Sequence, residues 1–208
     1  MMIGATPVIV VERYDRFQDP ADKKIKRLHQ EDCCQALGVA PQKKYQSEGG
    51  PGIPEIMDLL KFSKAPDIDR DRFMRAQAFN FVIGGTDAHA KNYSILYEPS
   101  GAFRLMPLYD VISFLPYHTR GAQLKLAMTV GGQRAIDEIL PRHWQRAAKC
   151  CDYPAGQAVE HVREMIEKLP DLAAAVRKAC MKSGLKHPVM AQITDQISAN
   201  ARRFTPRY

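Results

Sequence analysis

The sequence contains Gly84-Gly85-Thr86-Asp87-Ala88-His89-Ala90-Lys91-Asn92 and, a short distance later, Pro107-Leu108-Tyr109-Asp110, and these two segments are the most informative about the architecture. Before it, residues 69–83 place apolar side chains three and four residues apart, which predicts a helix with acidic residues at its start. The pair Gly84-Gly85 ends that helix, because glycine readily adopts the backbone conformations of helix ends. The first stretch is therefore expected to be a polar loop at the end of a helix.

A β-hairpin is predicted between the two stretches. Tyr93–Tyr97 and Ala102–Met106 read as short strands, and Glu98-Pro99-Ser100-Gly101 supplies the turn between them. An antiparallel hairpin reverses the chain, so Asp110 is expected to return to face Asn92.

The rest of the chain is predicted to be largely helical. Val8–Val11 reads as a strand and Ile56–Phe62 as a helix. After Ile136 the expected helices cover 137–150, 155–168, 171–183 and 188–203, with breaks at Pro154, Pro170 and Pro188. The predicted fold class is mainly α (α+β), a helical bundle with a small β-hairpin at the active site.

Three oxygen-bearing side chains occur in the order that phosphoryl transfer requires. Asp87 and Asn92 are separated by four residues, which is the spacing in the catalytic loop of protein kinases. Asp87 is the candidate base for the attacking hydroxyl, and Asn92 is a candidate metal ligand. Asp110, which follows a strand, is the candidate second ligand, because magnesium prefers oxygen donors.

The same residues are compatible with simpler roles. Asp and Asn often flank turns, because their side chains bond to the nearby backbone. His89 is alternatively a surface imidazole, and the pair Asp87-x-His89 alternatively belongs to a metal hydrolase, although no further ligands follow at helical or hairpin spacing. The chain has a helix that ends at two glycines, then a polar loop, a hairpin and an aspartate after the hairpin. This order favours the kinase-like interpretation.

The net charge of +7 is unevenly distributed. Residues 1–119 contain 15 basic and 15 acidic side chains, whereas residues 120–208 contain 15 basic and 8 acidic ones. This basic region suggests an acidic partner or a nucleic acid, and direct nucleic-acid contact is expected only there. A solvated basic helical surface explains the same composition.

Neither a targeting segment nor a disulfide framework is predicted. The N-terminal residues lack a basic leader region, and their apolar run, Pro7–Val11, is too short to span a membrane. The protein is therefore expected in the cytoplasm, without membrane contact. The five cysteines include two adjacent pairs and match no zinc-site spacing, so reduced thiols are expected.

Several ordered motifs cover most of residues 8–150. They are Val11-Glu12-Arg13-Tyr14-Asp15-Arg16, Gln30-Glu31-Asp32-Cys33, Lys44-Tyr45 with Gly49-Gly50-Pro51-Gly52, Thr86-Asp87-x-His89-x-Lys91-Asn92-Tyr93-Ser94, Pro107-Leu108-Tyr109-Asp110-Val111-Ile112-Ser113, Leu124-Lys125-Leu126-Ala127-Met128 and Ile139-x-Pro141-Arg142-His143. Together they resemble the C-terminal part of the HipA-type serine/threonine-protein kinase toxin family. The resemblance implies a kinase-like C-lobe.

The resemblance also implies an activity and partners. It implies a protein kinase that uses ATP and Mg²⁺ and is the toxin of a toxin–antitoxin pair. Its partners would be a small DNA-binding antitoxin and a protein substrate such as an aminoacyl-tRNA synthetase, whose phosphorylation halts translation.

Residue roles follow from the same resemblance. The backbone of Glu12 and Tyr14 would hold adenine as a hinge, Asp15 and His89 would lie near the ribose, and Tyr109 would sit beside the nucleotide. Asp87 would be the catalytic base, while Asn92 and Asp110 would bind Mg²⁺.

The chain departs from the family pattern before the hinge. Neither a Gly-rich loop that opens a helix nor a Val-Ala-x-Lys strand precedes Glu12, and Gly49–Gly52 is no substitute, because it follows the hinge and contains Pro51. The N-lobe is therefore expected to be absent, and little independent activity is expected, since losing one preorganised donor alone costs about 3–4 kcal/mol. The predicted divisions are 1–16 (hinge strand and connector), 17–130 (catalytic core) and 131–208 (basic helical subdomain).

Three functions are compatible with these observations. The first is a kinase C-lobe that acts with a separate N-lobe polypeptide. The second is a catalytically silent fragment that binds an antitoxin or another partner. The third, a DNA-binding protein, rests on charge alone. The acidic residues of the loop and of the hairpin exit favour the first.

Overall fold

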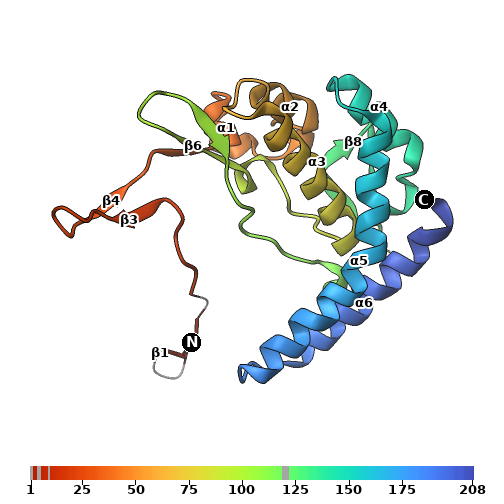
Figure 1. Ribbon diagram of the computed structural model, residues 1–208. Helices are drawn as coiled ribbons and strands as arrows, with labels where there is room; N and C mark the ends of the chain where they lie inside the picture. Colours follow the sequence, from red (N-terminus) through yellow and green to blue (C-terminus); the bar gives the residue numbers. More distant parts are fainter. Residues whose placement is uncertain (1, 4–5, 9, 119–121) are drawn as a thin grey trace.

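The computed structural model describes residues 2–3, 6–8, 10–118 and 122–208. In this part of the chain, helices form the body of the molecule and small antiparallel sheets accompany it (Figure 1). The fold class is mainly α with β, as the sequence predicts.

The described elements have the following bounds. The α-helices are α1 (Cys33–Ala36), α2 (Ile53–Leu60), α3 (Pro66–Ile83), α4 (Pro141–Cys150), α5 (Ala155–Lys182) and α6 (Pro188–Phe204). The 3₁₀ turns are η1 (Pro41–Lys43), η2 (Gln46–Glu48), η3 (Ala90–Asn92), η4 (Leu115–Tyr117), η5 (Ile136–Glu138) and η6 (Thr205–Arg207). The antiparallel sheets pair β1 (Met2–Ile3) with β2 (Thr6–Pro7), β3 (Arg16–Gln18) with β4 (Ile25–Arg27), β5 (Gln30–Asp32) with β6 (Ser94–Tyr97) and β7 (Phe103–Leu105), and β8 (Lys125–Val130) with β9 (Gln133–Ala135).

Helix α3 is the central element of the body. It packs against α2, α5 and α6 (Figure 1). Most of its residues between Phe73 and Ile83 are buried. Two polar side chains are buried with it, and the amides of Gln77 and Asn80 donate hydrogen bonds to the hydroxyl of Tyr93 at 2.8 and 3.0 Å. These bonds satisfy amide groups that would otherwise destabilise the core. The helix predicted over 69–83 is therefore confirmed.

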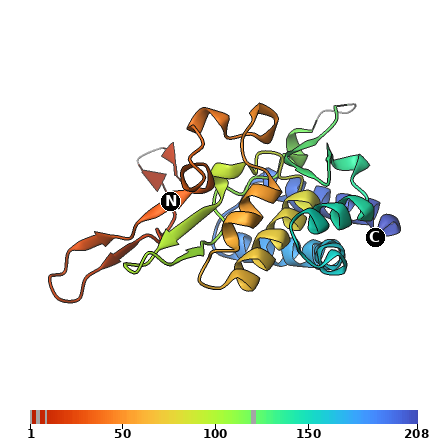
Figure 2. The ribbon, with the colours of Figure 1, turned by 90° about the horizontal axis from the view of Figure 1, so that it is seen from above.

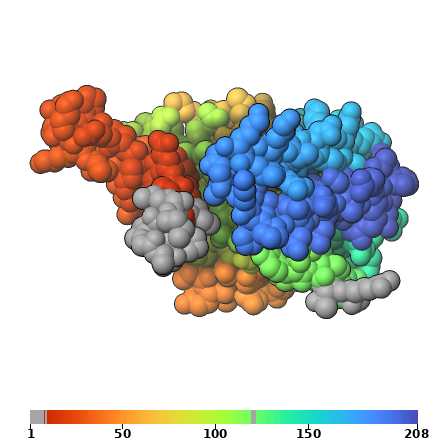
Figure 3. All heavy atoms as spheres, turned by 90° about the horizontal axis from the view of Figure 1, so that it is seen from below, coloured from red at the N-terminus to blue at the C-terminus, as the bar shows by residue number. Residues whose placement is uncertain are grey.

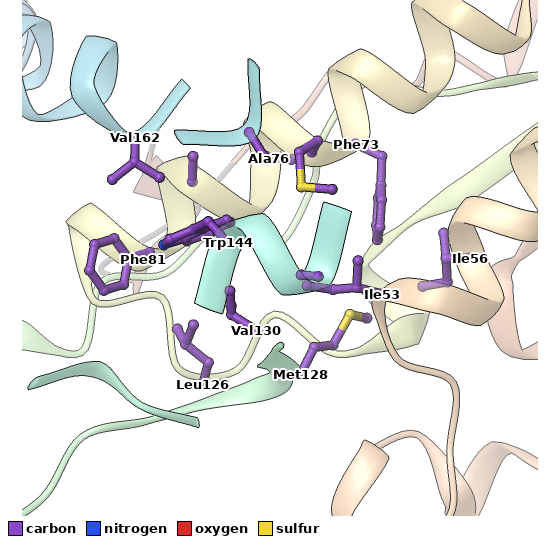
Figure 4. Close-up of a cluster of buried hydrophobic side chains, with 14 of the residues drawn as sticks. Ile53, Ile56, Phe73, Ala76, Phe81, Leu126, Met128, Val130, Trp144 and Val162 are labelled. Carbon is purple, nitrogen blue, oxygen red and sulfur yellow. The ribbon is translucent and has the colours of Figure 1, made fainter. Parts of the chain in front are cut away.

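The hydrophobic core joins α3 to elements that precede it and elements that follow it in the sequence. Figure 4 shows side chains of α2, α3, β8, α4 and α5 in one cluster, including Ile53, Ile56, Phe73, Ala76, Phe81, Leu126, Met128, Val130, Trp144 and Val162. The ring of Phe81 stacks on Phe204 at a centroid distance of 4.4 Å and meets the edge of Trp144 at 5.7 Å. Helices α3, α4 and α6 are thus held together at one aromatic contact.

The predicted hairpin is present as β6 and β7. Tyr97 pairs with Phe103 at its closed end, and Ile95 pairs with Leu105 further along. Strand β5 adds a third strand on the other edge of β6, with Asp32 paired to Ser94. This strand is polar and only three residues long, so no apolar alternation marks it in the sequence.

The predicted strand at Val8–Val11 is wrong for the residues that the structure describes there. Val8, Val10 and Val11 lie outside any strand, and residue 9 lies outside the described residues. The side chains of Val10 and Val11 are mostly exposed, so their apolar character does not reflect a buried sheet position. A short apolar run alone does not distinguish a strand from an exposed connector.

The predicted helix break at Pro170 is also wrong. Helix α5 continues through Pro170 from Ala155 to Lys182. Leu169 is buried and Ala173 packs against the core, so tertiary contacts hold the helix on both sides of the proline. The packing of α5 along α6 outweighs the one backbone hydrogen bond that proline removes. The other predicted helices are present with shifted bounds: 56–62 corresponds to α2 (Ile53–Leu60), 137–150 to α4 (Pro141–Cys150) and 188–203 to α6 (Pro188–Phe204).

The segment of residues 10–29 extends away from the helical body. Figure 2 shows the β3–β4 ribbon projecting from it, and Figure 3 shows the same segment standing clear of the α5–α6 face. No described helix has the length and apolar character needed to cross a bilayer. All five cysteines are free thiols, as predicted.

Candidate functional site

The loop after α3 carries Asp87, His89 and Asn92. Gly84 ends the helix with a φ of 65°, and its carbonyl accepts a hydrogen bond from the amide of Phe114 at 3.0 Å. Two further backbone bonds, from the His89 amide to Asp87 (2.8 Å) and from the Asn92 amide to His89 (2.9 Å), tighten the loop into η3. Asp87 is consequently exposed, whereas His89 and Asn92 are buried.

Asn92 and Asp110 are in direct contact. Nδ2 of Asn92 donates to Oδ2 of Asp110 at 3.0 Å and lies 3.3 Å from its main-chain oxygen. The hairpin produces this contact, since Ser94 begins β6 just after Asn92 and its carbonyl accepts from the amide of Met106 at 2.9 Å. The chain therefore returns to Asn92 as the hairpin predicts.

The contact leaves oxygen atoms suited to a hard cation. Oδ1 of Asn92 is buried and has no hydrogen-bond partner, and an unsatisfied buried acceptor is rare in folded proteins. Asp110 is exposed and has a left-handed backbone with a φ of 53°. Such a conformation at a non-glycine residue often marks a functional site. The donor set therefore fits Mg²⁺, which prefers oxygen ligands.

The rest of the neighbourhood adds no separate metal cluster. Within the described ranges, no three His, Cys, Asp or Glu side chains converge in a way that suits a metal ion. A cation at this place would therefore depend on the Asn92 amide oxygen as well as on a carboxylate.

His89 lies among the charges of the loop. Burial and the Lys44 cation lower the pKa of His89, and the carboxylates of Asp87 and Asp110 raise it by less. Its Nδ1 atom is buried without a hydrogen-bond partner. The charges of both carboxylates thus act on the same imidazole.

Asp87 is held by a tyrosine from far upstream. The hydroxyl of Tyr45 donates to Oδ1 of Asp87 at 2.6 Å, across 42 positions of the sequence. The Tyr45 ring also meets the His89 ring edge-on, with centroids 5.1 Å apart. Hydrogen bonding to Asp87, followed by burial, raises the pKa of Tyr45 to about 12.

A cavity of about 680 Å³ opens beside this site. It is lined by the segment Val11–Arg16, by Gln30 of β5 and by Pro107, Leu108 and Tyr109. Its volume is in the range of small-molecule and cofactor pockets. Because Tyr109 directly precedes Asp110, the cavity adjoins the Asn92–Asp110 contact.

The segment Val11–Arg16, which is the predicted hinge, is fixed by polar contacts. Arg13 donates hydrogen bonds to both carboxylate oxygens of Asp15 at 2.8 and 2.7 Å, and Arg16 forms an ion pair with the same carboxylate. The Arg13 hydrogen bonds hold the pKa of Asp15 at about 2. The hydroxyl of Tyr14 bonds to Oγ of Ser94 at 2.8 Å, which ties the hinge to β6.

Tyr109 closes the other wall of the cavity. Its hydroxyl donates to the carbonyl of Lys91, in the loop itself. Burial raises the pKa of Tyr109 well above its ordinary value, so the phenol stays protonated near neutral pH.

The structure brings the predicted residues together in two groups. Glu12, Tyr14, Asp15 and Tyr109 line the cavity, and Asp87, His89, Asn92 and Asp110 gather at the loop beside it. His89 is not on the cavity wall, although it was expected near the ribose together with Asp15. The roles of all eight residues stay predictions.

Sequence reasoning did not assign roles to Tyr45, Lys44 or Gln30. Tyr45 and Lys44 lie too far upstream for any spacing rule to link them to the loop, and only their place in an ordered motif marked them. Gln30 lines the cavity, and its buried Oε1 atom has no hydrogen-bond partner.

Comparisons with known proteins agree on one family. The model for the HipA-like C-terminal domain matches residues 1–174. The Sinorhizobium fredii protein named "Putative kinase Y4mE" is 43% identical over 169 residues, which cover 81% of this chain and 38% of that protein. The serine/threonine-protein kinase toxin HipA of Shewanella oneidensis is 32% identical over 136 residues, 60% of this chain and 31% of that protein.

A solved structure shows the same fold. HipA of Shewanella oneidensis, in a complex with HipB and operator DNA, superimposes with a TM-score of 0.80 at 23% identity, over 94% of this chain and 48% of that one. The chain thus spans less than half the length of these relatives. The family match over residues 1–174 shows that the chain belongs to the HipA-like C-terminal domain family, among relatives with kinase names.

Proposed function

We propose that this chain is the nucleotide- and magnesium-binding C-lobe of a HipA-like serine/threonine kinase that transfers a phosphoryl group from ATP to a protein hydroxyl. The observation that carries the proposal is the contact between Asn92 and Asp110, beside a cavity lined by the hinge. Membership of the HipA-like C-terminal domain family supports the same activity.

Asn92 and Asp110 would hold the metal ion. The unpartnered Oδ1 of Asn92 and the exposed carboxylate of Asp110 supply oxygen donors next to the cavity. Bound there, Mg²⁺ would offset the negative charge of the phosphates. Nδ2 of Asn92, by donating to Asp110, orients both groups.

The cavity would hold the nucleotide. The backbone groups of Glu12 and Tyr14 would recognise adenine, and the ring of Tyr109 would lie beside the nucleotide. Asp15 and His89 would lie near the ribose. Because Arg13 and Arg16 already bind the Asp15 carboxylate, Asp15 would shape the hinge as well as contact the sugar.

Asp87 would accept the proton of the attacking hydroxyl. Its side chain is exposed, so a protein substrate can reach it, and Tyr45 binds only one of its two oxygens. A general base must lie within hydrogen-bond reach of the proton that it removes. Oδ2 of Asp87, which accepts no hydrogen bond from the described residues, would take the proton of a hydroxyl presented from outside.

The proposal extends to partners. The family resemblance suggests an aminoacyl-tRNA synthetase as substrate, a DNA-binding antitoxin and an N-lobe that completes the nucleotide site, which a separate polypeptide would supply. The Shewanella oneidensis relative forms a complex with HipB and operator DNA. The basic residues 120–208 would provide any direct nucleic-acid contact of this chain.

The test is phosphoryl transfer from γ-labelled ATP to protein. The purified chain is assayed alone and after addition of a polypeptide that corresponds to the N-terminal part of its relatives. We expect transfer only with the added polypeptide, and we expect Asp87→Asn to lower the rate by about 10²-fold or more. Transfer that persists in Asp87→Asn contradicts the role of Asp87, and partner binding without any transfer favours the silent binding module.

A further inference from the structure

Tyr45 makes the one hydrogen bond that the described residues offer to the Asp87 carboxylate. The phenol oxygen lies 2.6 Å from Oδ1, which is a short, charge-assisted distance. Nothing in the activity proposed above requires a tyrosine at this position. The proposed activity therefore does not by itself explain the hydrogen bond between Tyr45 and Asp87.

The Tyr45 ring is fixed from two sides. The ring of His89 meets it edge-on at 5.1 Å with an interplanar angle of 83°, and the ammonium of Lys44 lies 4.9 Å from its centroid. An aromatic edge contact and a cation over the ring both restrict the side chain. These contacts hold the ring in an orientation in which its hydroxyl hydrogen-bonds to Asp87.

The backbone around Tyr45 is fixed as well. The carbonyl of Lys44 accepts from the Ala90 amide in the catalytic loop at 3.4 Å, and Oε1 of Gln46 accepts from the Thr129 amide in β8 at 2.6 Å. The turn closes where the Gly50 amide donates to the carbonyl of Tyr45 at 3.0 Å. A Cβ atom at Gly50 would lie 2.1 Å from the carbonyl of Lys43, so only glycine permits this approach.

The contact orients Asp87 without covering it. Asp87 stays exposed, so one carboxylate oxygen remains accessible to a substrate. A tyrosine is already protonated at neutral pH, and the bond to Asp87 raises the pKa of Tyr45 further, to about 12. Tyr45 is therefore a permanent donor at neutral pH and does not compete with Asp87 for the substrate proton.

We infer that Tyr45 is a positioning residue that fixes the Asp87 carboxylate so that its free oxygen faces the incoming hydroxyl. The inference rests on the proposed function. In the transfer step, the hydroxyl proton passes to Oδ2 of Asp87, the hydroxyl oxygen bonds to phosphorus, and the bond from phosphorus to the ADP oxygen breaks. Tyr45 keeps its proton throughout.

The first test compares Tyr45→Phe with Tyr97→Phe in the transfer assay. Tyr97 donates to Oε2 of Glu31 at 2.9 Å, so its variant loses a similar contact away from the site. We expect Tyr45→Phe to lower kcat at least tenfold with unchanged affinity for Mg-ATP, and Tyr97→Phe to change neither. An unchanged or raised kcat in Tyr45→Phe overturns the inference.

The second test needs no activity. Carbon-13 NMR of labelled tyrosine follows the ionisation of Tyr45 at pH 10.5 in the wild-type chain and in Asp87→Asn, with Tyr45→Phe used for assignment. We expect a protonated phenol in the wild-type chain and a more ionised one in Asp87→Asn, because the bond to Asp87 is the largest cause of the raised pKa of Tyr45. Ionisation in the wild-type chain shows that the contact is absent and overturns the inference.

The two tests separate the inference from the proposed function. If the wild-type phenol stays protonated while the chain neither binds Mg-ATP nor transfers phosphate, the proposed function fails and the positioning role falls with it. If transfer occurs and only the Tyr45→Phe result disagrees, the inference alone fails.

Discussion

At the scale of single residues, Asp110 shows how the site depends on backbone conformation. Its φ of 53° is unfavourable for most side chains, although Asp and Asn tolerate it better than others. The carboxylate reaches Asn92 from this conformation. The sequence predicts that the two residues meet, because a hairpin separates them, but it does not reveal the left-handed backbone that completes the contact.

A buried histidine gives a prediction on pH. Nδ1 of His143 accepts from the Leu140 amide at 3.0 Å at the start of α4, and burial, with Arg142 and Arg146 nearby, lowers the pKa of His143. A depressed histidine pKa means that the unfolded chain binds the proton more tightly than the folded chain. The contribution of neutral His143 to the free energy of unfolding is therefore present above about pH 6.5 and declines as the pH falls. Chemical denaturation should show this decline.

The variant His143→Gln isolates the effect. Glutamine is a usual residue at this position of a helix start, and it supplies an acceptor that does not titrate. We expect the fall in the free energy of unfolding between pH 7 and 5 to be shallower in the variant. An identical slope in both proteins shows that His143 does not contribute to it.

At the scale of elements, the end of α3 determines where the loop with Asp87, His89 and Asn92 starts. Gly84 combines a φ of 65° with close packing, because a Cβ atom there would lie 2.7 Å from Cγ of Leu115. The hydroxyl of Ser113 also donates to the carbonyl of Ile83 at 2.6 Å. The helix end and the segment after Asp110 are therefore joined at this glycine.

Replacement of Gly84 should be costly for this reason. Gly84→Ala combines a left-handed alanine with a steric clash, so we expect a loss of about 2–4 kcal/mol in the free energy of unfolding. Gly156→Ala is the matched control, since its Cβ atom would meet nothing within 4 Å in helix α5. It should leave stability unchanged or raise it by up to about 1 kcal/mol. Equal stability of both variants in urea denaturation contradicts this account.

The elements also show where sequence reasoning succeeds. Helix α3 and the β6–β7 hairpin are predicted because periodicity and turn residues are local signals. Strand β5 is missed and the break at Pro170 is wrong, because pairing with β6 and packing on α6 are tertiary effects. Tyr45 at Asp87 is a contact of the same kind, set by the fold of residues 43–52 rather than by any local pattern.

At the scale of the whole molecule, the site lies at an edge of the helical body. The cavity is bounded by the hinge segment, which extends from that body, and by Tyr109 at the exit of the hairpin. Val11 and Leu108, on its wall, are exposed apolar side chains. We expect the rest of the proposed enzyme to cover these residues, because exposed apolar surface beside a cavity is typical of an interaction site.

Asn92 and Asp110 are proposed to bind a metal–nucleotide complex. Isothermal titration calorimetry of the chain with Mg-ATP measures this binding, with Asp152→Asn as the matched control for Asp110→Asn. Asp152 is an exposed aspartate with a similar φ of 50°, so its variant makes the same change of charge and backbone context elsewhere.

We predict weak binding by the wild-type chain that needs Mg²⁺ and is kept in Asp152→Asn. Asp110→Asn should lower the affinity at least tenfold, or about 1.4 kcal/mol. Equal affinity in Asp110→Asn and the wild-type chain, or no binding by the wild-type chain, would contradict the account.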